Sequence, residues 1–144
     1  LAYQKGADVA LRTESGIVVA CDTVAECCGQ ILGKAKNVDH AREMLQLLSG
    51  REHRVYSGLC VWPRPGSEHH VQVDVTRLVM DSLTPSQLEE YLQTEAWEGK
   101  AGAFGYQDGL DWVHVVAGSE SNVVGLPMEL LAKMLSHISS SKID

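Results

Sequence analysis

The residues best suited to phosphate chemistry are one acidic and two basic side chains early in the chain. Asp22 follows directly on the apolar run Ile17 to Cys21, and Lys5 and Lys34 lie on either side of it. An acid at the carboxyl end of a buried strand stands where open α/β sheets bind their ligands, so Asp22 is a candidate general base or metal ligand. The alternative for Asp22 is a helix or turn cap. Lysine is a flexible point charge that suits phosphate, and its alternative is a solvated surface group.

The glycine-rich segment Gly99 to Gly105 is a second candidate for ligand binding. Small residues let the backbone approach a ligand closely, and Lys100 within the segment carries a positive charge. The spacing is neither that of a P-loop nor that of a dinucleotide fingerprint. Two interpretations are therefore open: Lys100 reaches a phosphate, or it only shapes a structural loop.

Other catalytic patterns are absent from the sequence. The histidines have no metal-ligand spacing, and the four cysteines include no C-x-x-C pair. Ser57 and Ser119 have no His and Asp partners in a known triad order, which argues against a serine hydrolase. The cysteine usage favours a reduced, cytoplasmic setting.

The elements that must position these residues alternate between helix and strand. Apolar periodicity predicts helices over 1–11, 38–49, 84–93 and 127–138, and strands over 16–23, 54–62, 70–80 and 112–117. The first strand is near-continuously apolar, which predicts burial on both faces, and the next two strands suggest a hairpin. The polar residues 139–144 are expected to be a frayed tail. The mixture predicts an α/β or α+β class.

Length and charge limit the function further. The chain has 144 residues, of which 44% are hydrophobic and 22% charged, as expected for one globular domain. No apolar stretch approaches the length of a membrane span, so a membrane partner is not expected. The formal net charge of −7 argues against binding a nucleic acid polymer. A small phosphorylated ligand is still possible where two or three lysines converge.

Several short blocks occur together and in order along nearly the whole chain. They are Ala20-Cys21-Asp22-Thr23-Val24, Ile31-Leu32-Gly33-Lys34, Ser49-Gly50-Arg51-x-His53, Gly99-Lys100-Ala101-Gly102 followed by Gln107, and Asn122-Val123-Val124-Gly125-Leu126-Pro127. Together they resemble the Maf family of nucleoside triphosphate pyrophosphatases. The resemblance implies a single Maf-like domain over residues 1–144, with a mixed sheet flanked by helices around a central nucleotide cleft.

The resemblance also implies an activity, which is cleavage of a nucleoside triphosphate between its α- and β-phosphates. Asp22 matches the family's catalytic acid, which helps to activate water and to bind a divalent metal, Mg²⁺ or Mn²⁺. Lys5 and Lys34 match lysines that neutralise the phosphates. Thr23 and Gln107 resemble the branch that prefers dTTP and UTP, and we expect both, with Lys100, to contact the substrate. The family's usual homodimer is the expected assembly.

One feature of the family is not found in these 144 residues. Family members normally open with a strand and a Ser-x-Ser-Pro-Arg-Arg loop that binds phosphates. The chain is then either a fragment of a complete enzyme or a truncated member, and we expect it to be weakly active or inactive alone. A nucleotide-binding or interaction module without turnover is the alternative function. Arg51 and His53 are interpreted as structural, with a phosphate role as the alternative.

Overall fold

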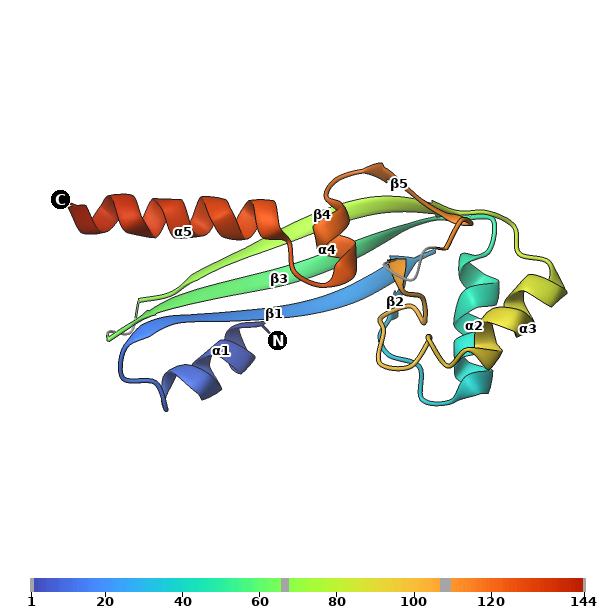
Figure 1. Cartoon of the computed structure of the whole chain (residues 1–144), viewed down its shortest axis with the longest axis horizontal. Coiled ribbons are helices and arrows are strands. Elements are labelled where there is room, and N and C mark those ends of the chain that lie inside the picture. The colour runs from blue at the N-terminus through green and yellow to red at the C-terminus, as the bar shows by residue number, and fades with distance from the viewer. Residues whose placement is uncertain (1, 66–67, 107–109, 144) are drawn as a thin grey trace.

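The computed structural model of the chain describes residues 2–65, 68–106 and 110–143. Its centre is a five-stranded sheet with the strand order β2-β1-β3-β4-β5 (Figure 1). The strands are β1 (Gly16–Cys27), β2 (Gln30–Leu32), β3 (Glu52–Arg64), β4 (His70–Met80) and β5 (Val113–Ala117). Every pairing between these described strands is antiparallel. The combination of one sheet with flanking helices confirms the expected fold class, and β3 and β4 form the expected hairpin.

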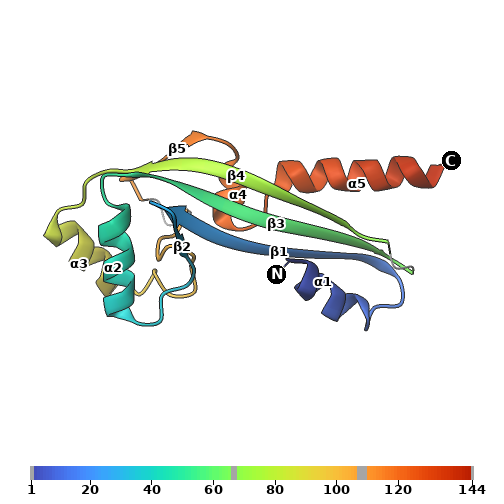
Figure 2. The ribbon, with the colours of Figure 1, turned by 180° about the vertical axis from the view of Figure 1, so that it is seen from behind.

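Most of the helices lie toward the two ends of the long strands (Figure 1). They are α1 (Ala2–Ala10), α2 (Val38–Leu48), α3 (Pro85–Gln93), α4 (Glu120–Val124) and α5 (Met128–Ile143). Figures 1 and 2 show α2 and α3 together at one end, and α1 and α5 on opposite sides of the other half of the sheet. The packing explains this, because α1 contacts Cys60 through Gly6 while α5 packs on Val61. Successive strand residues point to opposite faces of a sheet.

The main core lies between α2, α3 and the adjacent end of the sheet. Helix α2 buries Ala41, Met44, Leu45 and Leu48, which are spaced as one face of a helix. Helix α3 begins with a capping box, in which the Thr84 side chain accepts a hydrogen bond from the backbone N–H of Gln87. Apolar periodicity therefore identifies the buried face of α2, and the capping box identifies the first turn of α3.

Strand β1 differs from its prediction in two ways. It continues to Cys27 instead of ending at Thr23, so Asp22 lies within the strand and not at its carboxyl end. The expectation that this strand is buried on both faces is also wrong, since Ile17 and Val19 are 47% and 41% exposed. Antiparallel pairing with β3 extends the strand, because a long partner supplies backbone hydrogen bonds beyond the apolar run.

One further expectation is corrected, and two short elements were not predicted. Residues 139–143 continue helix α5 and are not a frayed tail, while Asp144 lies outside the described residues. The short elements β2 and α4 were not predicted as a strand and a helix. Each has five residues or fewer, which is too short for a periodic pattern to show. No helix among the described residues is both long enough and apolar enough to cross a membrane.

The turn between β1 and β2 has an unusual backbone. Cys28 and Gly29 are its two central residues, and both have positive φ, at 54° and 80°. The flanking residues Cys27 and Gln30 pair across the strands. Two central residues with positive φ make the tight hairpin turn whose twist matches the flanking strands.

Candidate active site

A cleft of about 230 Å³ lies beside β1, at the junction of α1, β1, the segment after β2 and the glycine-rich loop. Its lining includes Lys5, Asp22, Thr23, Lys34 and Lys100. The fold therefore brings together the predicted site residues that it describes. Gln107, the remaining predicted residue, lies outside the described residues.

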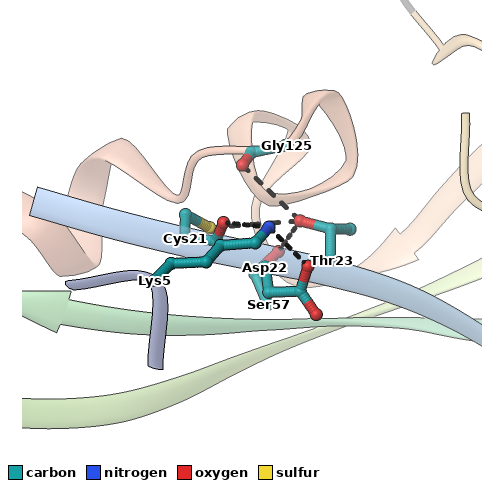
Figure 3. A network of polar contacts seen from close by, with 6 residues as sticks. All are labelled: Lys5, Cys21, Asp22, Thr23, Ser57 and Gly125. Atoms are coloured by element: carbon teal, nitrogen blue, oxygen red, sulfur yellow. Dashed lines mark hydrogen bonds and ion pairs between the residues drawn. The ribbon is translucent and has the colours of Figure 1, made fainter. Parts of the chain in front are cut away.

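Asp22 and Lys5 form the most direct contact in the cleft. The Lys5 Nζ atom lies 2.7 Å from Asp22 Oδ1 and also donates to the Cys21 carbonyl oxygen at 3.3 Å (Figure 3). Helix α1 can bring Lys5 this close because Gly6 packs on the sheet, where an added Cβ would be 3.3 Å from Cys60 Sγ. Among the described residues, Asp22 Oδ2 has no hydrogen-bond partner.

Thr23 reaches the cleft from the other face of β1. Strand β1 pairs with β2 only from Ala25 onward, so its edge beside Asp22 and Thr23 pairs with no described strand. The two side chains therefore border the same cleft around this edge. The Thr23 hydroxyl lies 2.7 Å from Ser57 Oγ and 3.5 Å from the Gly125 carbonyl oxygen, as Figure 3 shows.

A buried amide, not assigned a role from sequence, holds the cleft wall that Thr23 contacts. Asn122 in α4 is fully buried, and its Nδ2 atom donates to the Val55 carbonyl oxygen at 3.1 Å and to Thr76 Oγ1 at 3.0 Å. Ser57 Oγ donates to the Asn122 carbonyl oxygen at 3.4 Å. These bonds fix α4 against β3 and β4, and so they fix Gly125. The sequence marked Asn122 only as the first residue of the block that ends at Pro127, without a role for its side chain.

Ser57 belongs to this network and not to a catalytic triad. Its hydroxyl lies between Thr23 and the backbone of Asn122, and among the described residues no histidine contacts it. This agrees with the argument from sequence against a serine hydrolase.

The glycine-rich loop is attached to the segment that carries Lys34. Lys34 and Ala101 form a backbone bridge, and the Gly102 N–H donates to the Gly33 carbonyl oxygen at 3.0 Å. Gly102 has φ of +71°, and a Cβ there would lie 3.1 Å from the Phe104 ring. A glycine is therefore required, and the bridge places Lys34 and Lys100 on one side of the cleft.

A tyrosine closes the loop against α4. The Tyr106 hydroxyl donates to Glu120 Oε1 at 3.0 Å, which raises the pKa of Tyr106 because the hydrogen bond favours the protonated phenol. Tyr106 and Phe104 both line the cleft, so aromatic surface faces the same space as the lysines.

The charge of the described lining is positive although the chain is acidic. The lining contains three lysines and a single carboxylate, that of Asp22. Among the described residues, none pairs with the Lys34 ammonium group. Such a site attracts a polyanion, and flexible lysines suit phosphate oxygens.

The donor set suits a divalent cation that is shared with phosphate. No three His, Cys, Asp or Glu side chains among the described residues are grouped to hold a metal. Mg²⁺ usually keeps several waters and is bound by one or two carboxylates together with substrate phosphates. Asp22, with its second carboxylate oxygen unoccupied by described groups, fits this pattern.

Arg51 and His53 lie behind the cleft lining and not in it. Arg51 donates from Nη1 to the Leu47 carbonyl oxygen at 2.6 Å, which caps α2. His53 is 2% exposed, and its ring packs edge-on against Phe104 at a centroid distance of 5.2 Å. The structural interpretation of both residues is therefore supported, and neither borders the described cleft.

The family match and the similar proteins agree with each other. Residues 1–138 match the Maf family, described as Maf-like protein. The chain is 58% identical over 138 residues to a protein of Rhodopirellula baltica named dTTP/UTP pyrophosphatase, covering 95% of this chain and 61% of that protein. Proteins of the same name from Syntrophomonas wolfei and Carboxydothermus hydrogenoformans are 36% and 37% identical, each covering 94% of this chain and, respectively, 72% and 73% of those proteins.

The similarity covers only part of the length of each of these proteins. The chain spans less than two thirds of the Rhodopirellula protein's length and about three quarters of the other two. The matched region includes the described cleft residues, from Lys5 to Gly125. With a family match over nearly its whole length, the chain belongs to the Maf-like protein family.

Proposed function

We propose that this chain hydrolyses dTTP- and UTP-type nucleoside triphosphates to the monophosphate and pyrophosphate. The observation that carries the proposal is the convergence of Lys5, Lys34 and Lys100 with Asp22 around one cleft. Three cations offset much of the negative charge of a triphosphate, and the carboxylate can act on a water. The names of the similar proteins support the substrate class.

The chemistry divides between charge stabilisation and proton transfer. A water oxygen forms a bond to the α-phosphorus, the bond from that phosphorus to the bridging oxygen breaks, and pyrophosphate leaves. Asp22 orients this water and accepts its proton, while Lys5 fixes the carboxylate through Oδ1. Lys34 and Lys100 neutralise charge on the phosphate oxygens. When bound, Mg²⁺ or Mn²⁺ supplies further Lewis-acid charge, and Asp22 is the residue that would hold it.

Recognition of the base is proposed for the part of the cleft that Thr23 and two aromatic rings border. The Thr23 hydroxyl is held in place by Ser57, and the rings of Phe104 and Tyr106 offer apolar surface to a planar base. Gln107 follows Tyr106 in sequence, and an amide can both donate to and accept from a pyrimidine edge.

The test is pyrophosphate release from dTTP, UTP and a methylated GTP with Mg²⁺ or Mn²⁺. We expect Asp22→Asn to lower the release rate by about 100-fold or more, because a proton acceptor is lost. Asp8→Asn is the matched control, since Asp8 lies on α1 and pairs with Arg12 outside the cleft. Release that is unchanged in Asp22→Asn would reject the assigned role of this residue.

Binding is measured separately, by calorimetry with a dTTP analogue that has a methylene between the α- and β-phosphorus atoms. Lys34→Gln should weaken binding by about tenfold, because a charged hydrogen bond is lost. Lys36→Gln, two residues away and outside the cleft lining, should leave it unchanged. Binding without any release would replace the hydrolase with a nucleotide-binding module, and absence of both would reject the proposed function.

A homodimer in the cytoplasm completes the proposal. Val71, Val73 and Val75 lie on one face of β4 and are 48%, 62% and 39% exposed, which gives a second copy an apolar surface to contact. The four cysteines are free thiols, as a reducing compartment allows. Light scattering during size-exclusion chromatography measures the assembly directly, and a monomer mass would reject the dimer.

A further inference from the structure

Two thiols meet at the β1–β2 turn, away from the described cleft lining. Cys27 Sγ and Cys28 Sγ are 3.7 Å apart. Cys27 is buried at 1% exposure, while Cys28 is exposed. The proposed hydrolysis uses neither residue.

The turn conformation brings the two side chains together. Successive residues of a regular strand point to opposite faces, which would separate their sulfur atoms. Cys28, however, has φ of 54° and is a central residue of the tight turn, so it departs from the strand pattern. The pairing of Cys27 with Gln30 holds the turn in this form.

The distance between the sulfur atoms suits a bridging atom better than a direct bond. A disulfide needs an S–S distance of about 2.05 Å, so a disulfide would require the 3.7 Å separation to shrink considerably. Two bonds of about 2.3 Å, the length of a metal–thiolate bond, at the roughly 100° angle of a three-coordinate pyramidal atom place the sulfurs about 3.5 Å apart. The observed pair is therefore already spaced to chelate a single thiophilic atom.

The number of other ligand groups near the two sulfur atoms determines which atom the pair can bind. A structural zinc site needs four ligands, and among the described residues no third His, Cys, Asp or Glu joins this pair. The pair instead suits a three-coordinate electrophilic atom that binds two sulfurs and already has one permanent substituent. We propose that Cys27 and Cys28 form a vicinal dithiol site for monosubstituted trivalent arsenicals.

The reaction exchanges ligands on arsenic without any change of oxidation state. An arsenical RAs(OH)₂ meets the two thiols, two As–S bonds form and two As–O bonds break. Each thiol proton leaves with a hydroxyl oxygen as water. Exposed Cys28 attacks first, and Cys27 then closes the ring. Burial, with the neighbouring Cys28 thiol, raises the pKa of Cys27 to about 11, so its proton is still available to leave as water at neutral pH.

The experiment is intact-protein mass spectrometry after one equivalent of phenylarsine oxide, in the presence of excess monothiol such as glutathione. We expect one phenylarsenic adduct on each chain, retained in monothiol and removed by 2,3-dimercaptopropanol. Loss of either partner turns a chelate into a single bond, so Cys27→Ser and Cys28→Ser should each weaken retention by about 100-fold.

Cys21→Ser and Cys60→Ala are the matched controls, because these cysteines lie outside the turn. Both should keep the adduct, and circular dichroism of each variant checks that it is folded. Since Cys27 is buried, the exposed Cys28 variant is decisive if Cys27→Ser fails to fold. No adduct on the natural chain, or an adduct that survives Cys28→Ser, would overturn the proposal.

Discussion

Burial of His53 makes the stability of this protein depend on pH. The side chain is 2% exposed, and neither ring nitrogen has a hydrogen-bond partner of ordinary geometry among the described residues. Desolvation disfavours the charged imidazolium and lowers the pKa of His53 from its ordinary 6.5 to about 4, although the nearby Arg51 backbone limits the fall.

The size and sign of the effect follow from linkage. The difference between 6.5 and about 4 corresponds to about 3 kcal/mol, at 1.36 kcal/mol for each pKa unit. Between these two values the unfolded chain binds more protons at this site than the folded chain does. The free energy of unfolding therefore falls as pH is lowered through this window. Above pH 6.5 the term is absent, and below about pH 4 it is complete.

The assay is urea unfolding of the natural chain and of His53→Leu at pH 7 and pH 4. We expect the natural chain to lose about 3 kcal/mol more than the variant between these conditions, because leucine has no proton to bind. His114→Leu is the control, since this histidine is exposed beside Asp81. An equal loss in the natural chain and in His53→Leu would refute the reasoning.

Three other substitutions test the packing around the cleft by urea unfolding. Gly102→Ala should cost about 1–3 kcal/mol, because φ is +71° and the new Cβ meets Phe104 at 3.1 Å; an unchanged midpoint would contradict this. Asn122→Ala should cost about 2–3 kcal/mol through buried hydrogen-bond partners left unpaired, and a loss below about 0.5 kcal/mol would argue against the network. Thr84→Ala should cost about 1 kcal/mol by removing the capping box, whereas Ser86→Ala, within the same first turn, should cost less.

The parts of the fold that were predicted well carry strong local patterns. The alternating valines of His70–Met80 gave the bounds of β4 as observed, and the capping box placed the start of α3. The length of β1 could not be predicted, because the residues after Thr23 are strand through their pairing with β3 and, from Ala25 onward, with β2. Pairing between strands that are far apart in sequence produces no periodic pattern in the residues of either strand.

The sequence identified most residues of the site but not how the fold positions them. Charge and resemblance identified Asp22 and its lysines, and the fold places them around one cleft. The strand-end argument for Asp22 was wrong, since it borders the cleft from within β1. Asn122 was missed because its role comes from burial between two strands, which a single sequence does not reveal.

The long strands of the sheet run through three apolar clusters that are separate from one another. One cluster lies under α2 and α3, and two smaller clusters lie under α1 and α5 on opposite faces of the sheet. Cooperative opening follows such contiguous cores, so backbone amides at the two ends should exchange hydrogen with different protection. The cleft lies between the unit formed by α1 and its cluster and the unit formed by α2, α3 and theirs. Lys5 comes from α1, and Lys34 follows Leu32, which belongs to the α2 and α3 cluster. A polyanion bound there would tie the two units together and slow exchange in both, including helices that it never contacts.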